Sequence, residues 1–325
     1  MQFLHSNKRF LPLARFLGRP LDWPCLRGGR MGARFADVPA LAGIPLSLAA
    51  YFLFSSSDML VKALTREVPV FQVVLLQVAF AFIPFMLVVF RRGGFSTRIR
   101  NRSLVAIRGL LAGVNTLCGF YAFSTLPLAE VYAIVFCTPI VVTLASIPIL
   151  GETVGMHRIA VIVAGFLGIL VMIDPVATHF SLAHLSAFGS VLASAAVVLI
   201  MRKIGKEEDR VSMVAAVLAG ILLVGLPGAL IQWQPLSGKA LLIAAGSGFF
   251  MGVAQFVSLE ALRRAPASVI APLQYTMLVW ALAYGIAIFD DPVKANVLAG
   301  ALIVIAANLY NFHRERLRAR RSIEA

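Results

Sequence analysis

Ten long apolar stretches, separated by short polar connections, follow one another along this chain. Each has 19 to 23 residues, enough for a helix to cross the roughly 30 Å hydrocarbon core of a bilayer. The pattern therefore predicts an all-α integral membrane protein with ten transmembrane helices. The predicted spans are 41–62, 69–90, 103–124, 127–149, 155–173, 181–201, 211–231, 240–262, 267–289 and 293–312.

The two halves of the chain repeat each other at an offset of 139 residues. The repeated pairs are Gly109 and Gly248, Gly113 and Gly252, Val114 and Val253, Ala122 and Ala261, and Pro127 and Pro266. Because five spans per half is an odd number, the second half enters the membrane from the opposite side, as an inverted repeat. Inverted repeats are a recurrent plan of secondary transporters. The predicted parts are a basic extension (1–40), two repeats (41–173 and 181–312) and a basic tail (313–325).

Lysine and arginine are divided very unequally between the two sides that these spans define. Of the 29 Lys and Arg residues, 24 fall in the N-terminal extension, in or beside the connections after the even-numbered spans, and in the C-terminal tail. Lys62, Arg66, Lys239 and Lys294 fall on the other side, and Arg108 lies within the third span. Cytoplasmic loops carry the basic excess, so both termini are expected in the cytoplasm. This placement explains the net charge of +14 without a nucleic-acid partner.

The composition excludes an ordinary soluble domain. Hydrophobic residues make up 60% of the 325 residues, charged residues make up only 14%, and the mean hydropathy is +0.88. Cys25, Cys118 and Cys137 have no paired spacing and are interpreted as packing residues rather than as a disulfide or metal framework. The N-terminal extension has no convincing signal peptide, and Met31, just ahead of the first span, is an alternative start.

Charged residues within the spans are the sharpest functional signal. Insertion scales place the cost of each charge at roughly 2.5 to 3.5 kcal/mol near a helix centre, so a charge in this position needs a partner or water. The candidates for gating or coupling are Asp58, Lys62, Arg108, Glu130 and Glu260.

Each of these charges also has a structural explanation. Asp58 and Lys62 are one helical turn apart and are able to pair with each other, or else they form a gate or substrate contact beside the serine run that precedes them. Arg108 is expected at a similar depth to Glu260, as a structural pair or an inner gate. Glu130 lies at the start of the fourth span, where the helix dipole stabilises a carboxylate.

Uncharged polar and aromatic residues deeper in the spans are candidates for substrate binding. Such side chains either bind a polar solute or join helices by hydrogen bonds, and rings that face inward suit a planar solute. We expect Tyr121, Asn115 and Gln274 to face a cavity rather than lipid. The full set of substrate-binding candidates is Asn115, Tyr121, Tyr132, Gln255, Gln274, Tyr275 and Trp280.

Glycines and prolines predict where the helices pack and where they break. The GxxxG spacings at 109–113 and 248–252 place small residues on one helix face, which favours close packing. Pro139 and Pro272 lie inside the fourth and ninth spans, where each removes a backbone hydrogen bond and can kink or open the helix. Such a break either lines a cavity or is compensated by neighbouring helices.

Motifs of the common enzyme classes are absent from the sequence. There is no GxSxG, HExxH or Walker loop and no cysteine-histidine cluster, so we expect neither an enzyme nor a bound cofactor or metal. His157, His179 and His184 are interpreted as ordinary residues of the connections. Glu152 and Asp291, which occupy equivalent positions in the two repeats, are expected to cap the following helices, with gate control as the alternative.

A set of short motifs is distributed over both halves. The set comprises Tyr121-Ala122, Pro127, Pro139, Gly151-Glu152-Thr153 and the helix from Ala164 to Val171, then Arg264-Ala-Pro-Ala-Ser268, Ala271-Pro272-Leu273 and the segment from Gly300. It resembles the drug/metabolite transporter superfamily, of the EamA type with two five-helix repeats, over residues 41 to 313. The chain departs from the usual pattern of that superfamily at Gln77, Leu278 and Asp290-Asp291.

Part of the first half carries a narrower resemblance. The serine-rich stretch through Asp58 and Lys62, with Ile107-Arg108-Gly109-Leu110, resembles bacterial uptake carriers for cofactor-like metabolites, among them riboflavin and S-adenosylmethionine. Other relatives in the superfamily export amino acids.

Together these observations predict a transporter of the bacterial inner membrane that imports a small organic metabolite by alternating access. Its central site is expected between spans 1, 3, 4, 6, 8 and 9, and riboflavin is the expected substrate because an uncharged ring suits the amides and aromatics. The alternatives are an S-adenosylmethionine carrier, an exporter of amino acids or drugs, and a membrane structural or regulatory protein without transport. The expected partners are the solute and the lipid bilayer, and a homodimer is left open.

Overall fold

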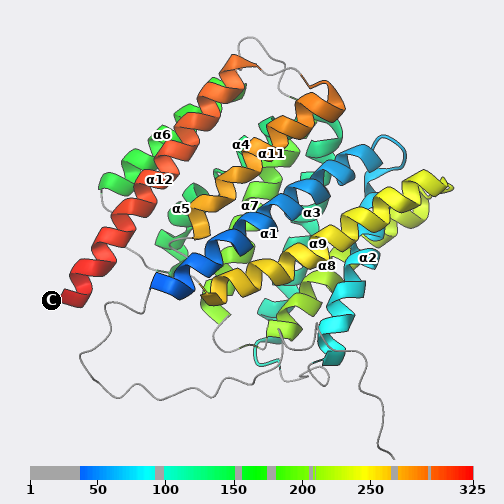
Figure 1. Ribbon diagram of the computed structural model, residues 1–325, viewed down its shortest axis with the longest axis horizontal. Helices are drawn as coiled ribbons and strands as arrows, with labels where there is room; N and C mark the ends of the chain where they lie inside the picture. The colour runs from blue at the N-terminus through cyan, green and yellow to red at the C-terminus, as the bar shows by residue number, and fades with distance from the viewer. Residues whose placement is uncertain are drawn as a thin grey trace, which may run out of the picture. The chain divides into compact units, whose positions relative to one another are not determined.

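The arrangement of the helices is given by a computed structural model (Figure 1). It describes residues 37–91, 99–150, 156–173, 181–204, 208, 210–264, 270–291 and 294–324. Cys25, Met31, Glu152 and His179 lie outside these ranges. Within them the chain is almost entirely helical and contains no strand.

The first half forms five spans from six helices. The fourth predicted span is made of two short helices, α4 and α5, which a turn at Phe136–Cys137 separates. The helices are α1 (Asp37–Leu64), α2 (Val70–Arg91), α3 (Arg102–Thr125), α4 (Leu128–Val135), α5 (Thr138–Leu150) and α6 (Met156–Ile173).

The second half repeats this plan, and its ninth span is also irregular. That span consists of a 3₁₀ turn, an α-helix and a π-helix in succession. The elements are α7 (Leu182–Ile204), α8 (Arg210–Ile231), α9 (Gly238–Arg264), η2 (Ala271–Tyr275), α11 (Thr276–Tyr284), η3 (Gly285–Phe289) and α12 (Ala295–Glu324).

Among the described residues, seven helical segments are long and apolar enough to cross a membrane, and two shorter apolar helices lie at Leu273–Phe289 and Ala295–Tyr310. Together with α6 they account for the ten predicted spans, and the predicted fold class is confirmed. Many large apolar side chains remain exposed on the helices, for example Phe90 at 78% and Leu242 at 75%. Exposure of this kind is expected where lipid is the solvent. One boundary differs from the prediction, because α12 continues as helix through most of the predicted tail, to Glu324.

Helix contacts follow the inverted repeat. Helix α1 packs along α9, and the equivalent pair, α7 and α3, packs in the same way. Helix α2 packs against α9 as its equivalent α8 packs against α3, and several helices contact their own equivalents: α2 with α8, α4 with α11, and α6 with α12, the last pair lying side by side in Figure 1. Each half therefore buries its helices mainly against the other half.

Glycine contacts show that this symmetry extends to single residues. A Cβ atom at Gly109 would collide with the carbonyl oxygen of Ala216, and one at Gly248 would lie 2.5 Å from the carbonyl oxygen of Gln77. Ala216 and Gln77 are themselves 139 residues apart. The predicted close packing at the two GxxxG spacings is present, and it requires glycine because the atoms approached belong to backbone.

The break between α4 and α5 is where proline was expected to interrupt the span. Pro139 has no N–H to donate to the carbonyl of Val135, and the Thr138 hydroxyl donates to that oxygen instead, at 2.7 Å. Asn308 of α12 donates to the carbonyl of Phe136, at 3.1 Å. Both bonds replace helix hydrogen bonds in a region that is buried among neighbouring helices.

The ends of several spans meet in one region, which we call the Lys62 end. It contains Lys62 at the end of α1, Leu126 before α4, His184 at the start of α7 and Asp291 after η3. The contacts that join these segments are given below. By the distribution of Lys and Arg, the Lys62 end is the one expected to face away from the cytoplasm.

Candidate functional site

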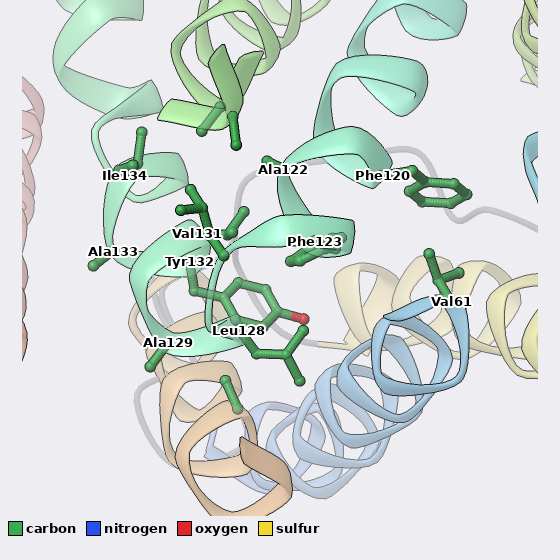
Figure 2. Packing of buried hydrophobic residues seen from close by; sticks show 14 of the residues in the cluster. Val61, Phe120, Ala122, Phe123, Leu128, Ala129, Val131, Tyr132, Ala133 and Ile134 are labelled. Carbon is green, nitrogen blue, oxygen red and sulfur yellow. The ribbon is translucent and has the colours of Figure 1, made fainter. Parts of the chain in front are cut away.

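The centre of the candidate site is Asp58 of α1. The Tyr132 hydroxyl, on α4, donates a hydrogen bond of 2.5 Å to its Oδ2 atom. Figure 2 shows Tyr132 beside Phe123 and Leu128, with its hydroxyl on the side of α1. A carboxylate within a membrane span is costly without such a donor, so this bond links a sequence-predicted gating residue to a predicted substrate-binding residue.

Serine side chains before Asp58 connect α1 to three other helices. Ser56 shares a hydrogen bond of 2.7 Å with the hydroxyl of Tyr284 on α11. Ser57 donates to the carbonyl of Ser247 on α9 and accepts a hydrogen bond of 3.1 Å from the Gln77 amide on α2. Successive side chains of α1 thereby contact α11, α9, α2 and, through Asp58, α4.

Aromatic side chains form two groups that reach α1 next to Asp58; we call them together the aromatic cluster. Tyr132 belongs to the first group and Tyr284 to the second, and both hydroxyls bond to α1 within residues 56–58. Rings in contact have centroids 4.8 to 6.4 Å apart. The groups are Phe123, Tyr132, Phe136 and Tyr275, and Phe52, Trp280 and Tyr284.

The expected pairing of Lys62 with Asp58 is wrong. The Lys62 ammonium instead lies 2.7 Å from Oδ2 of Asp291, donates to the carbonyl of Leu126 at 3.1 Å, and sits 4.8 Å from the centre of the Phe289 ring. The single helical turn between Asp58 and Lys62 permits a pair, but packing against α4 and η3 offers each residue a better placed partner. Asp291, which we expected to cap a helix, is the counter-ion of Lys62.

Glu130 and His184 form a second buried pair at the Lys62 end. The Nε2 atom of His184 lies 2.8 Å from Oε1 of Glu130, which joins α4 of the first repeat to α7 of the second. The backbone N–H of Ser181 donates to Nδ1 of His184, and because a backbone N–H only donates, Nε2 carries the hydrogen that bonds to Glu130. The interpretation of His184 as an ordinary residue of a connection is wrong.

Arg108 and Glu260 do not form the pair that we expected. The guanidinium of Arg108 donates to the carbonyl of Met213 on α8 at 2.9 Å. Glu260 pairs with Arg264, one turn further along its own helix, at 2.9 Å. The sequence predicts similar depths for them, but α3 packs against α7 and α8 rather than against α9.

The remaining predicted binding residues are dispersed. Asn115 accepts a hydrogen bond of 2.8 Å from Ser190 and so joins α3 to α7. Tyr121 and Gln274 are half-buried, whereas Gln255 is exposed on α9. Of the seven predicted substrate-binding residues, three belong to the aromatic cluster: Tyr132, Tyr275 and Trp280.

Sequence reasoning missed three functional candidates that the structure connects to the site. Asn308 donates a hydrogen bond to the backbone at the α4–α5 break, and His184 bonds to Glu130. The Phe289 ring lies against the Lys62 ammonium. The first two carried a usable signal, since each is a polar side chain within a predicted membrane span. Phe289 carried none, because phenylalanine occurs 23 times in this chain.

A half-buried carboxylate, two tyrosine hydroxyls and several rings lie together where two helices are broken and where the repeats meet. Discontinuous helices at a repeat interface are where membrane transporters place their sites. The sequence matches the EamA-like transporter family over residues 41–174 and 181–312. The chain therefore belongs to the EamA-like transporter family, within the drug/metabolite transporter superfamily, and is a multi-pass membrane transporter.

Known relatives of similar length transport different solutes. The chain is 25% identical to the S-adenosylmethionine uptake transporter of Rickettsia felis over 276 residues, covering 85% of this chain and 94% of the relative. It is 23% identical to the pseudopaline exporter CntI of Pseudomonas aeruginosa over 271 residues, covering 82% and 94%.

A solved crystal structure of a protein is among those with the same fold. It is 18% identical in sequence, with a TM-score of 0.58 over 87% of this chain and 99% of the other. At this identity the similarity bears on the fold alone.

Proposed function

We propose that this transporter takes up an organic cation that carries an aromatic ring, with S-adenosylmethionine as the leading substrate. One observation carries this proposal: the Asp58 carboxylate lies at the junction of the two groups of the aromatic cluster. A carboxylate among ring faces attracts a cation, since ring faces are electrostatically negative and the carboxylate supplies the counter-charge.

The chemistry of S-adenosylmethionine matches these groups. Its sulfonium and ammonium are cations, and its adenine is a planar ring that can stack on tyrosine or tryptophan. Hydrogen bonds to charged groups contribute about 1.5 to 3 kcal/mol, so the loss of the Asp58 charge should weaken substrate binding by roughly 10- to 150-fold.

S-adenosylmethionine replaces riboflavin as the working substrate. The names of the two relatives above give riboflavin no support, and a carboxylate near the rings favours a cation over an uncharged flavin. The uptake relative from Rickettsia felis favours the same substrate.

Transport would proceed by alternating access in the inner membrane, with the Lys62 end facing outward. The pairs Lys62–Asp291 and Glu130–His184 both join the first repeat to the second at that end. Opening the protein to the outside requires both pairs to separate, so the conformation described here is closed at the Lys62 end.

Export of an amino-acid-derived metabolite is the second candidate. It is favoured by the pseudopaline exporter among the relatives. An exporter and an importer can share one site, because the direction depends on the gradients and on coupling rather than on the groups that bind the solute.

The test is uptake of radiolabelled S-adenosylmethionine by a bacterial host that cannot import it, with and without this protein. We expect saturable uptake that excess unlabelled S-adenosylmethionine abolishes. S-adenosylhomocysteine, which lacks the sulfonium charge, should compete at least tenfold more weakly.

Variants locate the uptake at the proposed site. Asp58→Asn should lower uptake at least tenfold and Tyr132→Phe less, whereas Glu67→Gln, which removes a carboxylate charge from the partly exposed pair with Lys239, should leave it unchanged. Absence of uptake by protein that is present in the membrane would refute the import proposal. Release of loaded solute from vesicles would then test export.

A further inference from the structure

The surroundings of Lys62 form a complete binding site for a primary ammonium. The Lys62 side chain is only 7% exposed, and three groups surround its Nζ atom: the Asp291 carboxylate at 2.7 Å, the Leu126 carbonyl at 3.1 Å and the Phe289 ring at 4.8 Å. We call these three groups the cation cage. A charge-paired oxygen, a neutral acceptor and a ring face are the partners that an organic cation prefers.

No group of the cation cage belongs to the helix that fills it. Phe289 is the last residue of η3 and Asp291 follows it. The Leu126 carbonyl lies between α3 and α4, whereas Lys62 belongs to α1. The three groups of the cage are therefore held by other segments than the one that carries Lys62. If α1 shifts relative to η3, the Lys62 ammonium leaves and the three groups remain.

The backbone around η3 shapes the cage. Asp290 adopts a left-handed conformation with φ of 54°, and the N–H of Asp291 donates to the carbonyl of Gly285 at 3.0 Å. This tight reversal directs the Phe289 ring and the Asp291 carboxylate toward the same point. Single π-turns of this kind are frequent at functional sites.

A pocket adjoins the cage, and none of its lining residues belongs to α1. Asp291 is one of its lining residues, together with Glu130, Gly285 and Lys294. The charged side chains near the cage are Lys62, which pairs with Asp291, Arg66, whose guanidinium lies 4.8 Å from the Phe289 ring centre, and Glu130 and Lys294, which line the same pocket as Asp291. A ligand in this pocket would contact Asp291.

We propose that Asp291, Phe289 and the Leu126 carbonyl form a second binding site, specific for organic ammonium or sulfonium groups, which Lys62 occupies in the closed conformation. A cationic solute replaces Lys62 there when α1 moves, so the tethered amine and the solute exclude one another. The identification of that solute with the transported one rests on the proposed function, but the existence of the cage does not.

Chemical rescue tests the cage without any transport assay. Lys62→Ala removes three carbons and the ammonium, and propylammonium supplies those atoms. We expect purified Lys62→Ala to unfold roughly 5 to 10 °C below wild type, because the Asp291 carboxylate loses its counter-ion in a buried setting. Propylammonium chloride should restore at least half of that loss in a saturable manner.

Matched controls make the rescue specific. Sodium chloride at equal ionic strength and 1-propanol should restore nothing, and wild type should not respond. Lys239→Ala removes an exposed lysine whose partner is Glu67, and it should show neither the loss nor the rescue. Lys62→Ala combined with Asp291→Asn should not respond to propylammonium.

The outcomes separate cleanly. An equal response in the double variant, or no response in folded Lys62→Ala, overturns the cage. If Lys62→Ala is recovered in low yield, the readout becomes the folded amount obtained with and without propylammonium, and no gain overturns it equally. Rescue without any uptake of S-adenosylmethionine would keep the cage and refute the proposed substrate.

Discussion

A methyl group at Gly113 should force two helices apart. An alanine Cβ at this position would lie 2.5 Å from the carbonyl oxygen of Gly220 and 2.7 Å from Cγ2 of Val224, both on α8. Ordinary contact begins near 3.4 Å, so α3 and α8 must separate locally by roughly 0.9 Å. The Val224 side chain can rotate away, but the Gly220 carbonyl is backbone and cannot.

The expected cost follows from this separation. A gap of 0.5 to 1 Å loses about a quarter to a half of the dispersion energy of the atoms involved, and overpacking typically costs about 1 to 3 kcal/mol. The higher helix propensity of alanine compared with glycine offsets about 0.8 to 1 kcal/mol of this cost. Gly113→Ala should therefore be destabilised by up to about 2 kcal/mol overall, a fall of up to roughly 8 °C in Tm.

The matched control lies on the same helix. At Gly119 the nearest atom to an added Cβ is Oγ of Ser190, at 3.6 Å, which is ordinary contact. Gly119→Ala should keep or slightly raise the Tm, measured by tryptophan fluorescence during heating in one detergent. Equal Tm values for Gly113→Ala and Gly119→Ala would refute the packing argument. Gly248→Ala tests it again in the second repeat, against the Gln77 carbonyl.

Three further perturbations have defined outcomes. His184→Leu should lower stability by about 3 kcal/mol or more in thermal unfolding, because the buried Glu130 carboxylate loses its donor, and adding Glu130→Leu should recover part of the loss. Asn308→Leu removes the donor to the Phe136 carbonyl. Protease cleavage or hydrogen exchange should therefore become faster at the α4–α5 break than in the other spans. A hydrogen bond from Lys239 lowers the pKa of Glu67. The small contribution of this pair to the free energy of unfolding should therefore be present above pH about 4.5 and be lost as the pH falls through the lowered pKa. The Glu67→Gln variant should lack this pH-dependent contribution.

Much of the fold could be predicted because its signals lie along single helices. Apolar length predicts each span, and Pro139 predicts the break in the fourth span because a missing N–H is a property of one residue. The close packing at Gly113 and Gly248 was predictable for a similar reason, since small residues on one face favour contact whichever helix provides it.

The partners of the charged residues could not be predicted in the same way. Lys62 lies one turn from Asp58, yet it bonds to Asp291, 229 residues away. Arg108 and Glu260 have similar depths, yet their helices are not neighbours. Depth is readable from a sequence, but the rotation of each helix about its axis is not.

For this protein, the sequence by itself determined the ten spans, the inverted repeat, the family and the residues whose burial requires a partner. Only the tertiary structure decided the partners: Asp58 bonds to Tyr132, Glu130 bonds to His184, and Lys62 occupies a cage of three groups from other segments of the chain. The physical reason is that hydropathy acts on each helix separately. The register and rotation of one helix against another minimise the energy of all interfaces together, so they exist only in the assembled protein.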